Sequence, residues 1–139
     1  MREPWNEGPP AVQMRIARPT DQLDVVVRFY HEGVGLPIIG SFGGEGHEGY
    51  TGVMLGLPNH DYHLEFTQHE HGSPCPAPTD DNLLVFYVPD RSAIDAIAVR
   101  LAGMGFPEVP PENPYWEGRS VTVADPDGWR VVLMNTVGI

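Results

Sequence analysis

The sequence predicts an α+β fold built from two β-α-β-β-β modules. The first indication is an internal repeat: Gly-Val-Gly-Leu-Pro at residues 33–37 returns as Gly-Met-Gly-Phe-Pro at residues 103–107, 70 residues later. Pro19 and Pro89 are separated by the same 70 residues, and both landmarks fall at the same point of a strand–helix–strand pattern. The second indication is a pair of alternating apolar runs around an Asp-Pro-Asp-Gly turn within residues 120–136, which predicts a closing β-hairpin.

In the first half, residues 12–19 alternate in polarity and predict a strand. Thr20 or Asp21 can cap the helix that follows, and Gly35 ends it. The helix has an apolar stripe at helical spacing: Leu23, Val26, Val27, Tyr30 and Val34. Three further strands complete the order: residues 37–42, 50–55 and 62–69.

The second half repeats this order after a Pro-rich connector, residues 72–81. Residues 83–88 predict a strand, and Asp90 opens a helix. The apolar residues of this helix again have helical spacing: Ile94, Ile97, Leu101 and Met104. A loop over residues 110–118 leads into the closing hairpin. We therefore expect one domain, with module one at about residues 11–71 and module two at about 82–136.

The charge balance excludes two classes of partner. The chain carries 8 Lys+Arg and 19 Asp+Glu, a net charge of −11. Nucleic acids and anionic membranes bind proteins through Lys and Arg, so neither is expected here. The charge favours either a cationic ligand or simply solubility.

Cysteine usage and the N-terminus indicate the compartment. The single Cys75 cannot form an internal disulfide, and residues 1–10 lack the apolar centre of a secretion signal. No apolar stretch approaches the ~18 residues of a membrane span. We expect a cytoplasmic protein, with an irregular lead-in from which Trp5 can dock elsewhere.

Several motifs resemble one superfamily in their order and spacing. Phe29-Tyr30 precedes Gly35-Leu36 after the first helix, and Asp-Pro-Asp-Gly at residues 125–128 precedes the last strand. This pattern resembles the vicinal-oxygen-chelate superfamily (glyoxalase, bleomycin-resistance and extradiol-dioxygenase proteins), and five segments resemble a small glyoxalase-like branch: residues 15–20, 62–68, 83–90, 113–117 and 125–133. The resemblance implies curled sheets that form a cup around the ligand and, as for many short two-module members, a homodimer.

The resemblance also implies four metal-ligand positions, one on each of four strands. Carried over by position, these are Gln13, Glu65, Leu83 and Val132, with Arg15 as the other inward candidate on the first strand. Leu and Val side chains have no donor atom for a metal. We therefore predict that the ordinary metal site is lost and that no cofactor is bound.

A relocated site for one divalent metal is the alternative. His63, Glu65 and His69 lie on one face of the strand 62–69 because strand side chains alternate. Neighbouring side chains of this kind can bind one ion, so the site would consist either of His63 and Glu65 or of His63, Glu65 and His69. In the other interpretation, His63 lines the cavity as a hydrogen-bonding group and His69 lies at the solvated end of the strand.

Arg15 is expected beside Glu65 inside the cup. The two side chains then either hold a ligand, with Arg15 on its anionic or carbonyl group and Glu65 as base or acceptor, or neutralise each other. Arg18 falls on the opposite face, where we expect a surface or capping role.

Aromatic residues supply the remaining candidate ligand contacts. Tyr87 shares the face of Leu83 and should line the cup. Asn113, Tyr115 and Trp116 lie in the long loop before the last hairpin, where the resembled fold places a lip over the site. Loop aromatics can stack on a flat ligand, although Trp116 can equally close the end of the sheet.

Two functions from different classes follow. The first is a metal-free protein that binds and sequesters an aromatic or cationic drug-like molecule in its cup, as bleomycin-resistance proteins do. The second is a lyase, isomerase or dioxygenase of the glyoxalase kind, in which Glu65 and His63 are catalytic, with or without a relocated metal. The residues expected to bind the ligand are Gln13, Arg15, Tyr87, Asn113, Tyr115 and Trp116.

Overall fold

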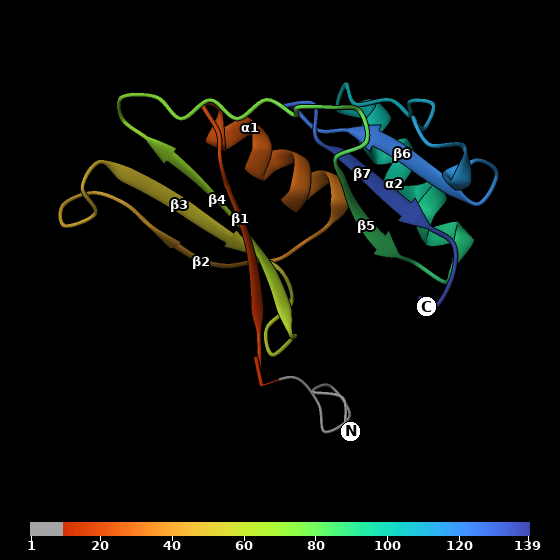
Figure 1. Ribbon diagram of the computed structural model, residues 1–139, viewed down its shortest axis with the longest axis horizontal. Coiled ribbons are helices and arrows are strands. Elements are labelled where there is room, and N and C mark those ends of the chain that lie inside the picture. The colour runs from red at the N-terminus through yellow and green to blue at the C-terminus, as the bar shows by residue number, and fades with distance from the viewer. Residues whose placement is uncertain (1–9) are drawn as a thin grey trace, which may run out of the picture.

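Two sheet-and-helix modules lie side by side in the computed structural model of the protein, which describes residues 10–139 (Figure 1). The predicted lead-in with Trp5 lies outside the described residues. Module one contains six elements: β1 (Met14–Pro19), α1 (Leu23–Arg28), the π-helical turn η1 (Phe29–Val34), β2 (Ile38–Phe42), β3 (Tyr50–Leu55) and β4 (Tyr62–His69). Module two contains five: β5 (Leu83–Tyr87), α2 (Arg91–Gly103), the 3-10 turn η2 (Pro114–Trp116), β6 (Ser120–Ala124) and β7 (Arg130–Met134).

The two sheets have equivalent topologies, which confirms the predicted fold class. Sheet one has the order β1-β4-β3-β2 and sheet two the order β5-β7-β6. In each, the first strand pairs in parallel with the last, while the other pairs are antiparallel. Two βαβββ-like modules thus follow one another in the chain.

One strand of the second module is reduced to a single bridge. Where the repeat predicts a strand after α2, the structure has only an isolated antiparallel bridge between Glu108 and Val123. Pro107 precedes this bridge, and Pro110 and Pro111 follow it. Proline cannot donate a ladder hydrogen bond, so pairing does not extend in either direction.

The first helix begins later than predicted. Gln22 occupies the N-cap position without a side-chain cap bond, whereas Thr20 or Asp21 was expected there. The backbone N–H of Leu23 instead donates to the side chain of Gln68 on β4, at 2.9 Å. A residue distant in the sequence therefore replaces the local cap, and Gly35, at φ 99°, ends the helix as expected.

The core joins the two modules through their helices. Buried side chains from α1, η1, α2 and both sheets form one cluster: Leu23, Val26, Phe29, Tyr30, Val34, Leu55, Leu64, Phe66, Ile94, Leu101, Val121, Val123, Val131 and Leu133. η1 approaches α2 so closely that a Cβ on Gly33 would overlap Leu101. Arg100 donates from Nε to the carbonyl of Gly33 at 2.9 Å and ties the helices together.

Strand alternation gives sheet one a helix-covered face and an open face. Leu64 and Phe66 of β4 belong to the core, and the ring of Phe66 stacks on Tyr30, so the even-numbered side chains of β4 face the helix. His63 and Glu65 therefore point to the opposite side, which we call the open face. Within residues 10–139, no helix has the length and apolar character needed to cross a membrane.

A buried ion-pair cluster fixes module two to module one. Arg18 on β1 donates to Asp125 at 2.6 Å and to Asp127 at 2.7 Å, and both acids belong to the turn between β6 and β7. Tyr30 also donates to Asp125, at 2.7 Å. The expectation of a surface or capping role for Arg18 is wrong, because the closing turn of module two covers this end of β1.

Burial and hydrogen bonding shift the pKa values of these acidic groups in opposite directions. Burial raises the pKa of Asp125, and the hydrogen bond from Tyr30 and the charge of Arg18 do not fully offset that effect. Burial also acts on Asp127, but hydrogen bonds from Gln22 and Arg18 outweigh it and lower the pKa of Asp127. Burial, with the nearby charge of Asp125, raises the pKa of Tyr30 well above its usual value.

Candidate functional site

Arg15, His63 and Glu65 form a polar cluster on the open face of sheet one. The parallel register pairs Arg15 with His63 and Ala17 with Glu65, which places the three polar side chains on the same face of adjacent strands. Arg15 donates from Nε to His63 Nε2 at 2.9 Å and from Nη1 to Glu65 Oε2 at 3.0 Å. One guanidinium thus connects the two residues that were expected to be catalytic.

The three side chains differ in exposure. His63 is 6% exposed and the side chain of Glu65 is 12% exposed, whereas the side chain of Arg15 is 49% exposed. The buried carboxylate is stabilised by the charge of Arg15, whose outer N–H groups remain accessible. The cluster therefore presents donors to a ligand while its only anionic group is compensated.

The hydrogen bond from Arg15 determines the tautomer of a neutral His63. Because Arg15 donates to Nε2, a neutral His63 carries its proton on Nδ1. Nδ1 is buried and has no hydrogen-bond partner among the residues described. A buried donor without a partner is costly, and an acceptor supplied by water or a ligand would remove that cost.

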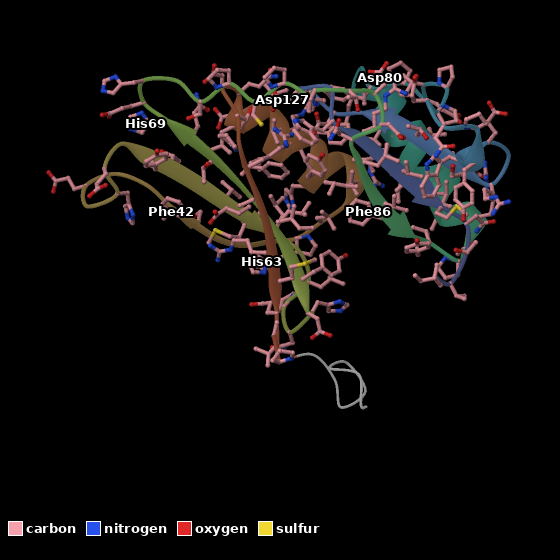
Figure 2. The ribbon with its side chains drawn as sticks, in the orientation of Figure 1. Phe42, His63, His69, Asp80, Phe86 and Asp127 are labelled. Carbon is pink, nitrogen blue, oxygen red and sulfur yellow. The ribbon has the colours of Figure 1, made fainter. Side chains whose placement is uncertain are left out.

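Apolar and aromatic side chains continue the open face across sheet one. Met54 on β3 lies opposite Glu65 in the antiparallel register, and Phe42 on β2 lies against Gly52, where a Cβ would overlap its ring. At the far end, the rings of Tyr50 and His69 are 4.6 Å apart. Figure 2 shows His63 and His69 near opposite ends of the strand, with Phe42 to one side.

Gln13 does not reach this cluster. Its side-chain amide donates to the carbonyl of His60 at 3.1 Å, in the loop before β4. Arg15 is instead the β1 residue in contact with Glu65. Of the two inward candidates on the first strand, Arg15 and not Gln13 contacts Glu65, and a ligand-binding role for Gln13 stays a prediction.

The residues present do not fit a metal ion of the kind used by the resembled superfamily. A guanidinium cation occupies the place beside Glu65, and the two remaining positions are the hydrocarbon side chains of Leu83 and Val132. His63 and His69 are six residues apart, about 20 Å along a strand. Within residues 10–139, no three His, Cys, Asp or Glu side chains are grouped to hold a metal, so the three-residue relocated site is wrong.

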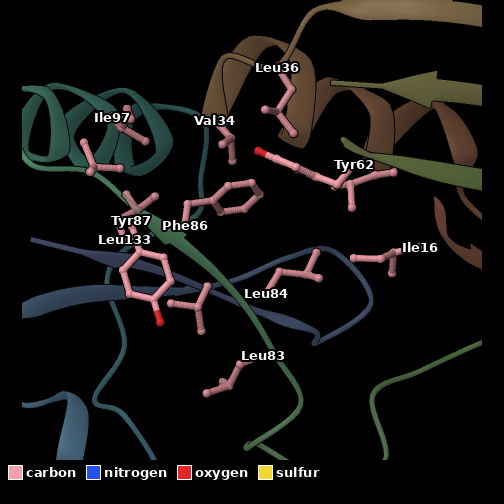
Figure 3. Close-up of a pocket in the computed structure, with 13 residues that line it drawn as sticks. Ile16, Val34, Leu36, Tyr62, Leu83, Leu84, Phe86, Tyr87, Ile97 and Leu133 are labelled. Carbon is pink, nitrogen blue, oxygen red and sulfur yellow. The ribbon is translucent and has the colours of Figure 1, made fainter. Parts of the chain in front are cut away.

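Tyr87 lines a groove between the modules. This groove has a volume of about 650 Å³ and an apolar lining that includes Ile16 of β1, Tyr62 of β4 and Phe86 of β5. Figure 3 shows Tyr62 and Phe86 facing each other across it. Tyr87 is 43% exposed at the end of β5, and the lining of the groove does not include Arg15, His63 or Glu65.

The predicted lip residues remain within module two. Asn113 accepts a hydrogen bond from the backbone N–H of Tyr115 at 3.0 Å and so caps η2. The ring of Tyr115 packs against Trp116, with centroids 4.8 Å apart, and under the guanidinium of Arg119. In Figure 1 this turn, beside β6, lies at the opposite end of the molecule from β2 and β3. A single chain does not bring these residues to the Arg15 cluster.

Two family models match the chain: the YycE-like N-terminal domain over residues 14–67 and the YycE-like C-terminal domain over residues 81–135. Uncharacterized protein YycE of Bacillus subtilis (strain 168) is 58% identical over 129 residues, which cover 93% of this chain and 91% of that protein. The crystal structure of a YycE protein of unknown function from Bacillus subtilis has a TM-score of 0.87 and 55% identity, covering 99% of this chain and 98% of that one.

More distant structures share the fold alone. Glyoxalase I of Leishmania major has a TM-score of 0.69 and 21% identity, over 88% of this chain and 85% of that one. TnmS3, an antibiotic binding protein from Streptomyces sp. CB03234, has a TM-score of 0.61 and 22% identity, over 88% of this chain and 93% of that one. The YycE-like family match and the shared fold together confirm the resemblance predicted from the sequence.

Proposed function

Because this chain belongs to the YycE-like family, with the glyoxalase/fosfomycin-resistance fold, we propose that it binds a small organic molecule on the open face of sheet one without a metal. The observation that carries this proposal is the position of Arg15. Its guanidinium contacts His63 and Glu65 and remains half exposed, so it offers hydrogen-bond donors where a metal would otherwise lie. Phe42 and Met54 supply apolar surface beside it.

Metal content is the first test. Protein purified without chelators should contain less than about 0.1 equivalent of Ni, Mn, Fe or Zn, because a cation placed near Glu65 must displace Arg15. One tightly bound ion per chain, released in Glu65→Ala and kept in Glu32→Ala, would overturn the metal-free proposal. Glu32 is the matched control, since it also pairs with an arginine but on the surface of the helix.

We also propose that a second copy of the chain completes the site on the open face. Within residues 10–139, β1 pairs only with β4 and β5 only with β7, so each sheet has an unpaired edge next to the other module. Apolar side chains are exposed along these strands: Met14, Ile16, Tyr62 and Tyr87. Unpaired, apolar strands of this kind favour association. Met14, Ile16 and Tyr62 lie on the helix side of sheet one, so they mark its edge and not the open face. We place β5 of a second copy beside the unpaired edge of β1, so that sheet two of that copy turns toward the open face and brings Tyr87 and the 113–116 turn to the ligand.

Oligomeric state tests this second step. Light scattering coupled to gel filtration should give twice the chain mass of 15.3 kDa. Ile16→Lys, which places a charge among the exposed apolar residues of β1, should shift the protein to monomer, whereas Val99→Lys on the exposed face of α2 should not. A wild-type monomer at 100 micromolar would overturn the shared site while leaving binding at the open face testable.

Acid–base catalysis is the second candidate function. The adjacency of His63 and Glu65, both hydrogen-bonded to Arg15, favours it, because acid–base catalysis uses proton-transfer groups that lie side by side. Glu65 would then act as the base on a carbon next to a carbonyl group. Deuterium uptake by hydroxyacetone in D₂O measures this directly. Uptake that is lost in Glu65→Gln would establish an enzyme, whereas no uptake above the buffer rate would leave binding alone.

A further inference from the structure

We infer that the ligand of the Arg15 cluster is an uncharged molecule with a carbonyl group next to an N–H or O–H group, of which a carboxamide is the simplest case. The inference rests on the proposed binding function and specifies the chemical class of the ligand. It follows from the charge balance of the cluster and from the hydrogen-bonding groups that the protein leaves unused.

The cluster has no net charge to offer an anion. The Arg15 and Glu65 head groups are 3.0 Å apart, and the imidazole of His63 accepts a hydrogen bond from the same guanidinium. An anion that approaches Arg15 therefore also meets the carboxylate of Glu65 at nearly the same distance, and repulsion cancels most of the attraction. The net charge of −11 opposes anions further.

A cation is disfavoured by the same pair. It would have to share Glu65 with Arg15, which places two positive charges around one carboxylate that is already compensated. Because Glu65 is largely buried, water does little to screen that repulsion. Electrostatics at the cluster thus selects against both signs of charge.

The unused hydrogen-bonding groups match a neutral donor–acceptor pair. A guanidinium has five N–H donors. Arg15 directs one to His63 and one to Glu65, and its half-exposed side chain presents the others to the open face. Glu65 Oε1 receives no hydrogen bond from residues 10–139, so one acceptor lies beside those donors. A carboxamide can accept from Arg15 through its oxygen and donate to Glu65 through its nitrogen.

The neighbouring surface suits a ring attached to that group. Met54 lies opposite Glu65 on β3, and Phe42 covers Gly52 one pair further along the strand. Methionine sulfur and an aromatic ring both make favourable contacts with a planar ligand. Benzamide, benzoate and benzamidine are therefore suitable probes, because they share ring and shape and differ in charge.

Titration of ¹⁵N-labelled protein with these three probes tests the inference. We expect the probes to shift the Nε–H signal of Arg15. Benzamide should bind at least about fivefold more tightly than benzoate or benzamidine, because the opposite charges of Arg15 and Glu65 cancel the attraction for either charged probe. Arg15→Lys, which retains the charge and loses the planar fork, should weaken benzamide at least about fivefold. This comparison of probes needs only the wild-type protein to be decisive.

A charge-neutralisation experiment separates the class of ligand from the existence of the site. Glu65→Gln leaves the Arg15 charge uncompensated and should raise the affinity for benzoate about tenfold. Glu32→Gln changes the net charge by the same amount at an exposed ion pair and should leave the affinity for benzoate unchanged. Wild-type protein that prefers benzoate or benzamidine through Arg15 would overturn the ligand class alone. No Arg15-dependent binding of any probe would overturn the proposed function as well.

Discussion

Replacing Arg18 by Met tests whether the ion-pair cluster between the modules stabilises the fold. The side chains of Arg18, Asp125 and Asp127 are 12%, 0% and 10% exposed, so the three groups are buried together. Methionine fills much of the space but leaves two neighbouring carboxylates without their cation. Tyr30 still donates to Asp125, and Gln22 still donates to Asp127, so part of the network survives.

The expected loss follows from the burial of these groups. Removing one partner of a buried ion pair costs about 3–5 kcal/mol. Arg18 also lies over the rings of Phe66 and Trp129, at 4.9 and 5.5 Å, and a cation–π contact adds about 0.5–2 kcal/mol. Apolar contacts of the methionine with these rings offset part of that loss, so we expect a decrease of about 4 kcal/mol in the free energy of unfolding. For a chain of this size the melting temperature should fall by about 10–15 °C.

Urea unfolding at pH 7, followed by tryptophan fluorescence, measures this change. Arg28→Met is the control, because Arg28 pairs with Glu32 on the surface and such a pair contributes less than about 0.5 kcal/mol. Adding Asp125→Asn to Arg18→Met should restore at least about 1 kcal/mol, since it removes the uncompensated buried charge. An Arg18→Met variant within about 1 kcal/mol of the wild type would refute the argument.

Two further predictions concern pH and helix contact. Asp127 has a pKa below its usual 3.8, so its stabilising effect is present above that pH and is lost as the pH falls through the lowered value. The difference in unfolding free energy between wild type and Asp127→Asn should therefore be largest near neutral pH and shrink below pH 3.8. Urea titrations at a series of acidic pH values measure this difference, and a difference that stays constant would contradict the prediction. Gly33→Ala forces a methyl group into buried Leu101 and should cost about 1–3 kcal/mol of unfolding free energy. Gly103→Ala, with nothing within 4 Å of the added Cβ, should be neutral or stabilising, and urea titrations of both variants at pH 7 measure the difference.

Local signals in the sequence were sufficient for most of the fold. Alternation and helical spacing predicted strands and helices because each depends on neighbouring residues. The repeat then predicted two equivalent modules. It did not predict that the strand at Glu108 would shrink to one bridge, because the prolines around it act only where a ladder hydrogen bond is needed. Nor did it predict that Gln68 would replace the helix cap, which depends on tertiary packing.

The sequence predicted the part of the candidate site that lies on β1 and β4, but not the contributions of the other strands. Period-2 alternation placed Arg15 and Glu65 on one face, and the structure has them in contact. The contribution of Met54 and Phe42 depends on strand register, and residue spacing alone does not specify register. Arg18 was misjudged because its partners lie more than 100 residues away, on a turn whose docking no local pattern describes.

The repeat shows that the two modules have diverged at the positions that form the site. The offset of 70 residues relates Arg15 to Val85, and strand pairing relates His63 to Val132, because each faces the corresponding first-strand residue. The same pairing relates Glu65, the partner of Ala17, to Met134, the partner of Tyr87. All three polar positions of module one are therefore apolar in module two.

This divergence explains why the proposed site needs both kinds of module. A polar cluster on one sheet gains strength when water is excluded from it, and an apolar sheet surface can exclude water without competing for its hydrogen bonds. Two identical polar modules would instead bring two arginine–glutamate pairs face to face, and two apolar modules would give a ligand no orientation. In the proposed dimer, a polar floor from module one beneath an apolar cover from module two would suit the small, uncharged, hydrogen-bonding ligand that we infer.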